Sequence, residues 1–195
     1  MLLQLLLIIS AYLLGSISSA ILICKLMRLP DPRTTGSNNP GATNVLRIGG
    51  KKAAALVLLG DAAKGFIPVL IARMLGCDEF TQALVLFAAF MGHLFPVFFQ
   101  FEGGKGVATT IGGLIAFSSW LAVLWGATWL LVAALFRYSS LSALVATCLL
   151  PFYAWMLSQS IAVITIFSIL SLILLYRHKS NIKKLCLGQE KKLGQ

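Results

Sequence analysis

Long apolar stretches alternate along this chain with short polar connections. Stretches close to the roughly 20 apolar residues needed to cross a bilayer predict membrane-spanning helices. We expect seven such helices, at residues 1–26, 53–75, 80–101, 107–119, 120–136, 141–157 and 161–176. The pattern therefore predicts an all-α integral membrane protein built as a seven-transmembrane-helix bundle.

Two of these helices have alternative interpretations. Residues 1–26 resemble a secretory signal peptide in hydropathy, but they lack a basic N-terminal region and continue apolar past the small residues at 16–20. Residues 107–136 could form one long tilted helix, but such a helix exceeds the length that a bilayer core requires. Because Ser118 and Ser119 supply a turn, we favour two short helices there.

Basic residues gather on one side of the predicted bundle. They follow the first, third, fifth and seventh helices, whereas the opposite connections carry Asp78 and Glu79 or only residues 158–160. The positive-inside tendency then places the N-terminus outside and the C-terminus in the cytoplasm, with every polar loop on the cytoplasmic side. We expect a single polytopic membrane domain over residues 1–186 and a basic cytoplasmic tail over residues 187–195.

Composition supports the membrane assignment and excludes some functions. The chain is 58% hydrophobic and 11% charged, outside the range of soluble proteins. Its net charge of +10 is explained by topology and by attraction to anionic lipid headgroups, so nucleic-acid binding has no support. The four cysteines are scattered, which argues against a disulfide framework or a zinc site. We expect no metal and no cofactor.

The first polar connection contains residues 35–47, Thr-Gly-Ser-Asn-Asn-Pro-Gly-Ala-Thr-Asn-Val-Leu-Arg. Its glycines permit close backbone approach, and Arg47 adds a planar charged fork suited to phosphate. Short hydroxyl and amide side chains lie between them, at Ser37, Asn38, Asn39, Thr43 and Asn44. The segment is either a phosphate site or a plain turn in which Asn44 caps a following helix.

A second polar connection holds Gly103, Gly104, Lys105 and Gly106 directly before the apolar residues 107–119. Backbone N–H groups at the start of a helix and the Lys105 ammonium can converge on one anion. The loop is not a Walker A motif, because the glycine spacing differs and Gly106 replaces the Ser or Thr after the lysine. An oxyanion site without nucleotide hydrolysis is predicted.

Three titratable residues fall within the predicted helices. Asp61 and Lys64 lie three positions apart and share a helix face, where they form a structural ion pair or bind a ligand directly. His93 lies near the inner end of the third helix, just before the glycines. It is either a structural hydrogen-bond donor or a residue that orients the loop or touches substrate.

The final helix leaves the membrane at residues 176–185, Tyr-Arg-His-Lys-Ser-Asn-Ile-Lys-Lys-Leu. His178 and Asn181 are three residues apart, so they share a helix face and can reach one interfacial pocket. Ser140 lies at the same predicted surface. Because the inner face lacks paired carboxylates for a divalent cation, these residues predict metal-free recognition of phosphate at the membrane surface.

Four ordered motifs resemble a known family. They are Gly-Ser-Asn-Asn-Pro-Gly-Ala-Thr-Asn-Val-Leu-Arg, Gly-Asp-Ala-Ala-Lys-Gly, His-Leu-Phe-Pro-Val-Phe-Phe-Gln-Phe-Glu-Gly-Gly-Lys-Gly-Val-Ala-Thr and Arg-His-Lys-Ser-Asn-Ile-Lys-Lys-Leu. Over about residues 10–186 the chain is similar to the bacterial acyl-phosphate:glycerol-3-phosphate acyltransferases (PlsY). Acyltransferases that use thioesters carry Asp five residues after the motif histidine, where this chain has Phe98 and Lys183.

The resemblance implies an enzyme of phospholipid synthesis in the bacterial inner membrane, with its active site facing the cytoplasm. It would transfer a fatty acyl group from acyl phosphate to glycerol 3-phosphate, the first acylation step, giving lysophosphatidic acid and inorganic phosphate. A peripheral acyl-phosphate-forming enzyme would be its partner. A transporter of phosphorylated solutes is the competing interpretation, but no repeat between halves supports it.

Site residues also follow from the resemblance. The residues expected to bind phosphate are Ser37, Arg47 and Lys105, together with Gly103 and Gly104. The residues expected to shape the pocket are Asn39, Thr43 and Asn44. His178, Asn181 and Ser140 would complete the site, and Asp61, Lys64 and His93 would support it. Asn38 stands where the family usually has glycine, and Asn tolerates positive φ better than other residues that carry a side chain.

The mechanism expected is direct attack of the glycerol hydroxyl on the acyl carbon. Acyl phosphate is a mixed anhydride with a good leaving group, so no acyl-enzyme is required. Either His178 or a substrate phosphate would take the proton. Ser37 is expected to bind phosphate rather than act as nucleophile, because no activating base and orienting acid are evident beside it.

Overall fold

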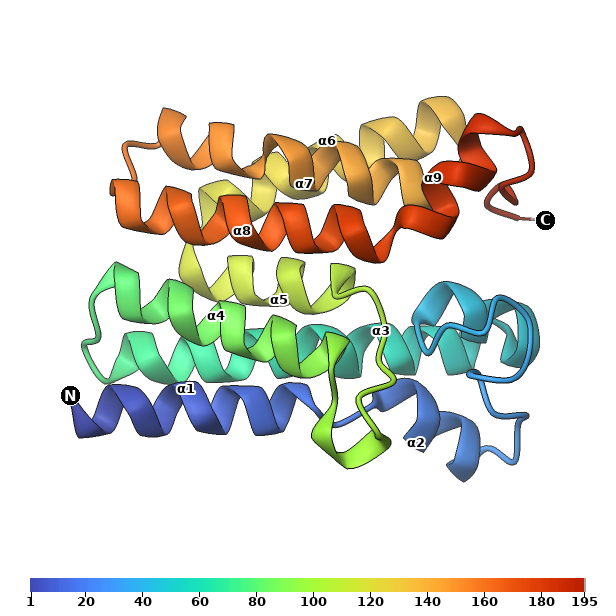
Figure 1. Ribbon diagram of the computed structural model, residues 1–195, viewed down its shortest axis with the longest axis horizontal. Coiled ribbons are helices and arrows are strands. Elements are labelled where there is room, and N and C mark those ends of the chain that lie inside the picture. Colours follow the sequence, from blue (N-terminus) through green and yellow to red (C-terminus); the bar gives the residue numbers. More distant parts are fainter. Residues whose placement is uncertain (195) are drawn as a thin grey trace. The chain divides into compact units, whose positions relative to one another are not determined.

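The computed structural model describes residues 1–194, over which every regular element is a helix (Figure 1). The prediction of an all-α protein is therefore confirmed. The chain divides into two compact units, unit 1 from Met1 to Phe117 and unit 2 from Ser118 to Gln195.

Unit 1 is built around one long helix. Its elements are α1 (Leu2–Gly15), α2 (Ser19–Leu26), α3 (Ala42–Met74), α4 (Glu79–Leu94), the 3₁₀ helix η1 (Val97–Phe99) and α5 (Val107–Phe117). Helix α3 packs against α1, α2, α4 and α5, and α4 also packs against α1 and α5 (Figure 1). Glycines permit this close approach: a Cβ on Gly65 or Gly112 would overlap the backbone of the facing helix.

The predicted first helix is broken in the structure. Residues 1–26 form α1 and α2, which are bent by 40° from one another. The Ser18 hydroxyl accepts a hydrogen bond from Ile21 N at 3.4 Å and so caps α2. Lys64 Nζ on α3 donates to Ile17 O at 2.9 Å, so a carbonyl at the break is satisfied by a buried ammonium.

Helix α3 begins earlier than predicted. It starts at Ala42, eleven residues before the expected start at residue 53, and it is kinked at Gly50, where φ is +77°. The second half of the polar segment is therefore helical, and Thr43 and Arg47 lie on the first turns of α3. The alternative in which Asn44 caps this helix is wrong, because Gly41 is the capping residue and makes no side-chain cap.

Unit 2 is a smaller helical bundle. Its elements are α6 (Ser119–Phe136), α7 (Ser139–Met156), α8 (Ile161–Arg177) and α9 (Lys179–Cys186). Helix α7 packs against α6 and α8, and α9 contacts α7 and α8 (Figure 1). The predicted turn before α6 is confirmed, because Leu121 N donates to Ser118 Oγ at 3.5 Å. Helices α8 and α9 are bent by 60° at His178.

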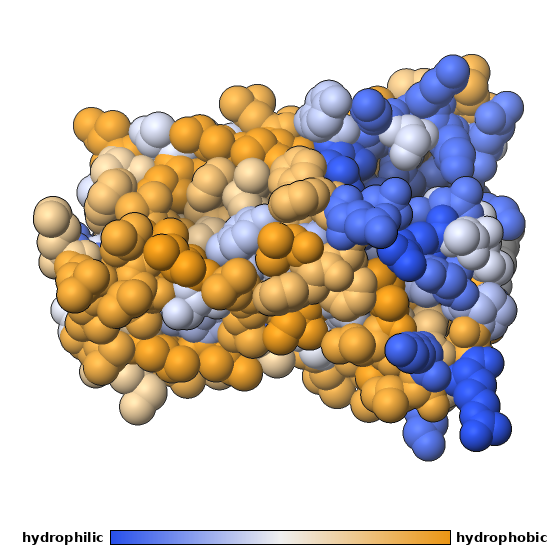
Figure 2. All heavy atoms as spheres, turned by 60° about the horizontal axis from the view of Figure 1, so that its bottom comes forward, coloured by the Kyte–Doolittle hydropathy of each residue, from blue (hydrophilic) through white to orange (hydrophobic). Residues whose placement is uncertain are grey.

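Hydrophobic side chains cover much of the face shown in Figure 2, as a protein in contact with lipid requires. Four helices in the described part of the chain are long and apolar enough to cross a bilayer, or six if each bent pair is one span. Helix α5 is a shorter apolar helix. The structure thus has the helices of a membrane protein, with spans less regular than the hydropathy pattern suggests.

Candidate active site

Two connections of unit 1 carry the predicted phosphate-binding residues. The polar loop (residues 31–41) joins α2 to α3, and the glycine loop (residues 103–106) leads into α5. They lie against each other, because a Cβ on Gly104 would stand 3.1 Å from Pro40 O. Two motifs more than sixty residues apart in sequence are therefore neighbours in unit 1.

Asn44 organises the polar loop. Its Nδ2 donates to Pro32 O and to Thr35 O, both at 2.9 Å, and its Oδ1 accepts from Ser37 N at 2.8 Å. The side chain is 1% exposed, so these three hydrogen bonds replace those that the amide loses to water on burial. Asn44 therefore fixes the backbone on both sides of Gly36 and sets the position of Ser37.

Asn38 adopts the left-handed conformation that the sequence led us to expect, with φ of +55°. Asn enters this region more readily than other residues with a side chain, because its short amide can bond locally. The turn in the polar loop thus forms without glycine at this position, and Asn39 follows it. Ser37 and Arg47 are exposed, and neither side chain bonds to another residue within 1–194.

The glycine loop follows a tight backbone path. Gly104 N donates to His93 O at 3.1 Å, and a Cβ on Gly103 would overlap the carbonyl oxygens of His93 and Leu94. A Cβ on Gly104 would overlap the His93 ring. Only glycine fits at these two positions, and their close approach to His93 and Leu94 sets the backbone path that brings Lys105 to the start of α5.

A buried ionic cluster lies beneath this loop. Lys64 Nζ is 2.9 Å from Asp61 Oδ1, and His93 Nδ1 is 3.6 Å from the same oxygen. All three side chains are at most 6% exposed. The predicted ion pair on α3 is thus confirmed, and His93 joins it to the glycine loop. These contacts favour a supporting role for the three residues, because their polar atoms face one another inside the protein.

The bend between α8 and α9 positions the unit 2 residues. His178 stands at the bend and is 2% exposed. Its Nδ1 lies 2.9 Å from Leu174 O, and since a carbonyl only accepts, Nδ1 carries the proton. This tautomer makes Nε2 the basic nitrogen of the neutral imidazole, as a general base requires.

Glu190 contacts two of the predicted site residues, which the sequence interpretation did not anticipate. Its Oε1 accepts hydrogen bonds from Ser140 Oγ and from Asn181 Nδ2, both at 2.7 Å. The tail is tied down further, since Leu193 N donates to Arg137 O at 2.6 Å. The sequence signal was weak, because one carboxylate in a basic tail resembles an ordinary surface charge. Its position after the glycine turn at Gly188 was the available clue.

We expect Glu190→Ala to lower kcat/KM about tenfold, since it removes two charge-assisted hydrogen bonds that orient Ser140 and Asn181. Glu190→Gln keeps an accepting oxygen and should lose less. Steady-state kinetics of the purified variants, with exposed Gln189→Ala as the matched control, measure this effect. Wild-type kcat/KM in Glu190→Ala would show that the contacts do not matter for the reaction.

Comparison with known proteins identifies the family. The family model described as glycerol-3-phosphate acyltransferase matches residues 5–188. The chain belongs to the glycerol-3-phosphate acyltransferase family. It is 54% identical to the Glycerol-3-phosphate acyltransferase of Methylococcus capsulatus, covering 97% of this chain and 96% of that one. The Vibrio vulnificus relative of the same name is also 54% identical, over 96% of this chain and 91% of its own.

Two crystal structures are also similar. Both are of PlsY, described as an integral membrane glycerol 3-phosphate acyltransferase. The glycerol 3-phosphate form matches with a TM-score of 0.93 at 40% identity, covering 98% of this chain and 96% of that one. The lysophosphatidic acid form matches with a TM-score of 0.89 at 39% identity, over 98% and 95%. The enzyme is thus a membrane acyltransferase of phospholipid synthesis.

The predicted residues of this acyltransferase fall into two groups. Unit 1 holds Ser37, Asn39, Thr43, Asn44, Arg47, the glycine loop and the Asp61–Lys64–His93 cluster, and unit 2 holds Ser140, His178 and Asn181. Among residues 1–194, no three or more His, Cys, Asp or Glu side chains are grouped to hold a metal ion. The polar groups at hand are amides, hydroxyls and cations, which suit phosphate oxygens.

Proposed function

We propose that the enzyme transfers a fatty acyl group from acyl phosphate to glycerol 3-phosphate, giving lysophosphatidic acid and inorganic phosphate. The observation that carries this proposal is the contact between the polar loop and the glycine loop of unit 1. The glycine loop, which carries Lys105, thus lies beside a loop that exposes Ser37. Related PlsY structures in glycerol 3-phosphate and lysophosphatidic acid forms support the acceptor and the product.

Phosphate recognition is assigned to the cations and donors of unit 1. The exposed Arg47 guanidinium and the Lys105 ammonium neutralise phosphate oxygens, and Ser37 donates a hydrogen bond to them. The positive end of the α5 dipole, at the start of that helix, adds to this attraction. Asn44 and Asn38 hold the polar loop in shape, and Thr43 and Asn39 flank it.

Acyl transfer needs no covalent intermediate on the protein. The glycerol hydroxyl oxygen forms a bond to the acyl carbon, and the bond from that carbon to the phosphate oxygen breaks. Phosphate leaves with its electron pair, and positive groups stabilise the developing charge. The donor is already activated, so positioning of the two substrates supplies much of the rate acceleration.

The proton of the attacking hydroxyl passes to His178 Nε2 or to a substrate phosphate. The Nδ1 contact to Leu174 O favours the tautomer in which Nε2 can accept it. Asn181, oriented by Glu190, contacts substrate oxygens through its amide, whereas Ser140 donates its one hydroxyl proton to Glu190 and offers its oxygen to the substrate as an acceptor. Near-normal turnover of purified His178→Ala would exclude His178 as the general base and leave the substrate phosphate.

We also infer the predicted topology of seven apolar segments, with the N-terminus outside and both loops on the cytoplasmic side of the bacterial inner membrane. The positive-inside distribution of lysine and arginine supports it. Acyl phosphate would then be delivered from the cytoplasm by a peripheral enzyme that forms it. Residues 1–186 would make up the membrane domain, and residues 187–195 the tail that carries Glu190.

Donor specificity tests the proposed reaction. The purified enzyme in lipid vesicles is given glycerol 3-phosphate and one of three palmitoyl donors: the acyl phosphate, the coenzyme A thioester or the acyl carrier protein thioester. We expect lysophosphatidic acid with acyl phosphate alone, because the loops suit a phosphate leaving group. Product from a thioester and none from acyl phosphate would reject the proposed donor while leaving the family assignment intact.

A further inference from the structure

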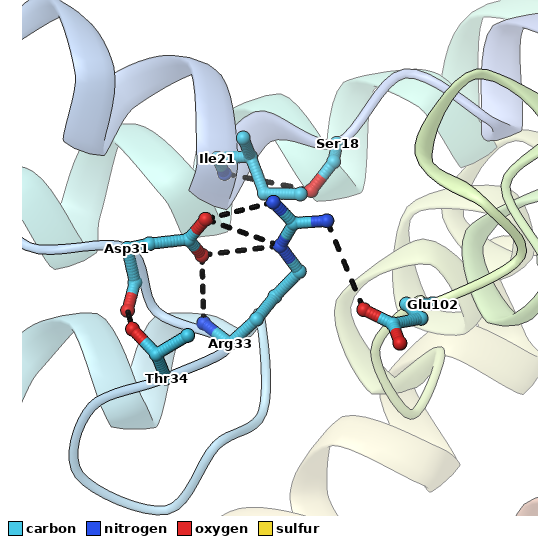
Figure 3. A network of polar contacts seen from close by, with 6 residues as sticks. All are labelled: Ser18, Ile21, Asp31, Arg33, Thr34 and Glu102. Carbon is cyan, nitrogen blue, oxygen red and sulfur yellow. Dashed lines mark hydrogen bonds and ion pairs between the residues drawn. The ribbon is translucent and has the colours of Figure 1, made fainter.

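Arg33 belongs to the polar loop, and its side chain lies between Asp31 of the same loop and Glu102 of the turn that precedes the glycine loop (Figure 3). On one side its Nη2 is 2.8 Å from Asp31 Oδ2, and on the other its Nη1 is 3.8 Å from Glu102 Oε2. Glu102 is the residue immediately before Gly103. One guanidinium therefore links two loops that are distant in sequence and that both carry proposed phosphate ligands.

Asp31 fixes the direction of this guanidinium. Arg33 Nε donates to both carboxylate oxygens of Asp31, at 3.1 and 3.2 Å, and Arg33 N donates to Oδ1 at 2.9 Å. A planar fork held on one edge by a carboxylate can turn little, so its other arm stays directed at Glu102. The same hydrogen bonds lower the pKa of the Asp31 carboxyl, which keeps it ionised at neutral pH.

Glu102 closes a turn with unusual backbone geometry. Gln100 and Phe101 both have left-handed conformations, with φ of +55° and +60°. Backbone hydrogen bonds hold this turn, from Phe101 N to Pro96 O and from Glu102 N to Phe99 O, each 3.0 Å long. Residues with side chains are disfavoured in the left-handed region of backbone conformation, so this turn is strained and needs contacts to hold it. Because Glu102 directly precedes Gly103, a contact that holds Glu102 also restrains the start of the glycine loop.

The charge of Glu102 opposes the proposed function of its neighbours. Its carboxylate is 64% exposed and one residue from a loop expected to bind phosphate, where a negative charge repels the ligand. Arg33 faces this carboxylate and offsets its charge. The Arg33 contact thus holds Glu102 beside the polar loop and offsets part of the negative charge next to the glycine loop.

We propose that Arg33 is a positioning residue, which clasps the polar loop to the glycine loop through Glu102 and so sets the affinity for the substrate phosphate. Arg33 does this without touching the substrate. The inference rests on the proposed phosphate-binding role of the glycine loop. It adds three residues, Asp31, Arg33 and Glu102, to those that determine recognition of glycerol 3-phosphate.

A double-mutant cycle tests the clasp. The variants are Arg33→Gln, Glu102→Gln and the pair together, with kcat and the KM for glycerol 3-phosphate measured for each. We expect Arg33→Gln to raise this KM about two- to fivefold with little change in kcat, as the loss of an exposed ion pair allows. In the Glu102→Gln background the same substitution should change KM less than twofold, since the turn before the glycine loop then carries no carboxylate for Arg33 to bind.

Salt and a matched variant sharpen the result. At 1 M salt the Debye length is about 3 Å, so the ratio of the Arg33→Gln KM to the wild-type KM should fall towards one. Lys52→Gln removes the same charge from an exposed residue of α3 and should leave KM unchanged. The thermal unfolding temperature of each variant, measured in detergent, separates a loss of folding from a loss of affinity.

Two outcomes would overturn the clasp: an unchanged KM in Arg33→Gln, or an equal rise of KM in both backgrounds. Lys105→Gln, assayed in parallel, distinguishes this failure from a failure of the proposed function. If Lys105→Gln raises KM while the Arg33 effects are additive, only the clasp is wrong. If Lys105→Gln also leaves kcat and KM unchanged, the glycine loop is not the phosphate site.

Discussion

We expect Lys105→Met to lower kcat/KM for acyl transfer by about 100-fold or more. Removing one preformed donor from an oxyanion site typically costs this much, because the remaining groups leave the developing charge unneutralised. Methionine keeps most of the length and the apolar stem of lysine, so the loss isolates the ammonium. Steady-state assays with purified protein in lipid measure it, at saturating and at limiting glycerol 3-phosphate.

Lys51→Met is the matched control for this substitution. Lys51 is an exposed residue of α3 next to the kink at Gly50, and it has no assigned role in the site. Its loss changes the net charge by the same amount, so a purely global electrostatic effect would appear equally in both variants. Similar kinetics of the two variants would mean that Lys105 does not contact the reacting phosphate.

The second large effect is expected at Asp61. Asp61→Asn should destabilise the protein by about 3 kcal/mol, because it leaves the buried Lys64 ammonium without its counter-charge. For a chain of this size the unfolding temperature should fall by about 5–10 °C. Thermal unfolding in detergent or lipid nanodiscs, followed by circular dichroism, would report the change.

The double variant Asp61→Asn with Lys64→Met isolates the uncompensated charge. It should recover part of the lost stability, although the Lys64 hydrogen bond to Ile17 O is also removed. Asp78→Asn is the control, since Asp78 caps α4 at an exposed position where asparagine caps equally well. If the double variant were no more stable than Asp61→Asn, the buried charge would not be the cause.

Hydropathy predicted the approximate positions of the helices and the turn at Ser118, but not the bends within the first and last predicted spans. The break between α1 and α2 depends on Ser18 capping and on Lys64 from another helix, which no local pattern records. The early start of α3 was missed because residues 42–52 include a threonine, an asparagine, an arginine, two glycines and two lysines and were assigned to a loop. Their helical conformation depends on packing: Val45, for example, is fully buried with Ala20 and Val57.

The candidate site was predictable in its residue types and less so in its contacts. Glycines, hydroxyls and cations in short loops indicate phosphate chemistry, and the Asp61–Lys64 spacing predicted an ion pair that the structure contains. Long-range partners were not predictable. Neither the Glu190 contacts with Ser140 and Asn181 nor the bridge from Arg33 to Glu102 follows from sequence spacing.

The most direct test of phosphate-held acyl transfer is a rapid-quench experiment with acyl phosphate labelled in its acyl chain. Enzyme in excess is mixed with this donor in the presence or absence of glycerol 3-phosphate. We predict one lysophosphatidic acid and one inorganic phosphate per acyl phosphate consumed when the acceptor is present, and no label on the protein when it is absent. Label retained on the protein, or consumption of acyl phosphate without lysophosphatidic acid, would contradict direct transfer to glycerol 3-phosphate.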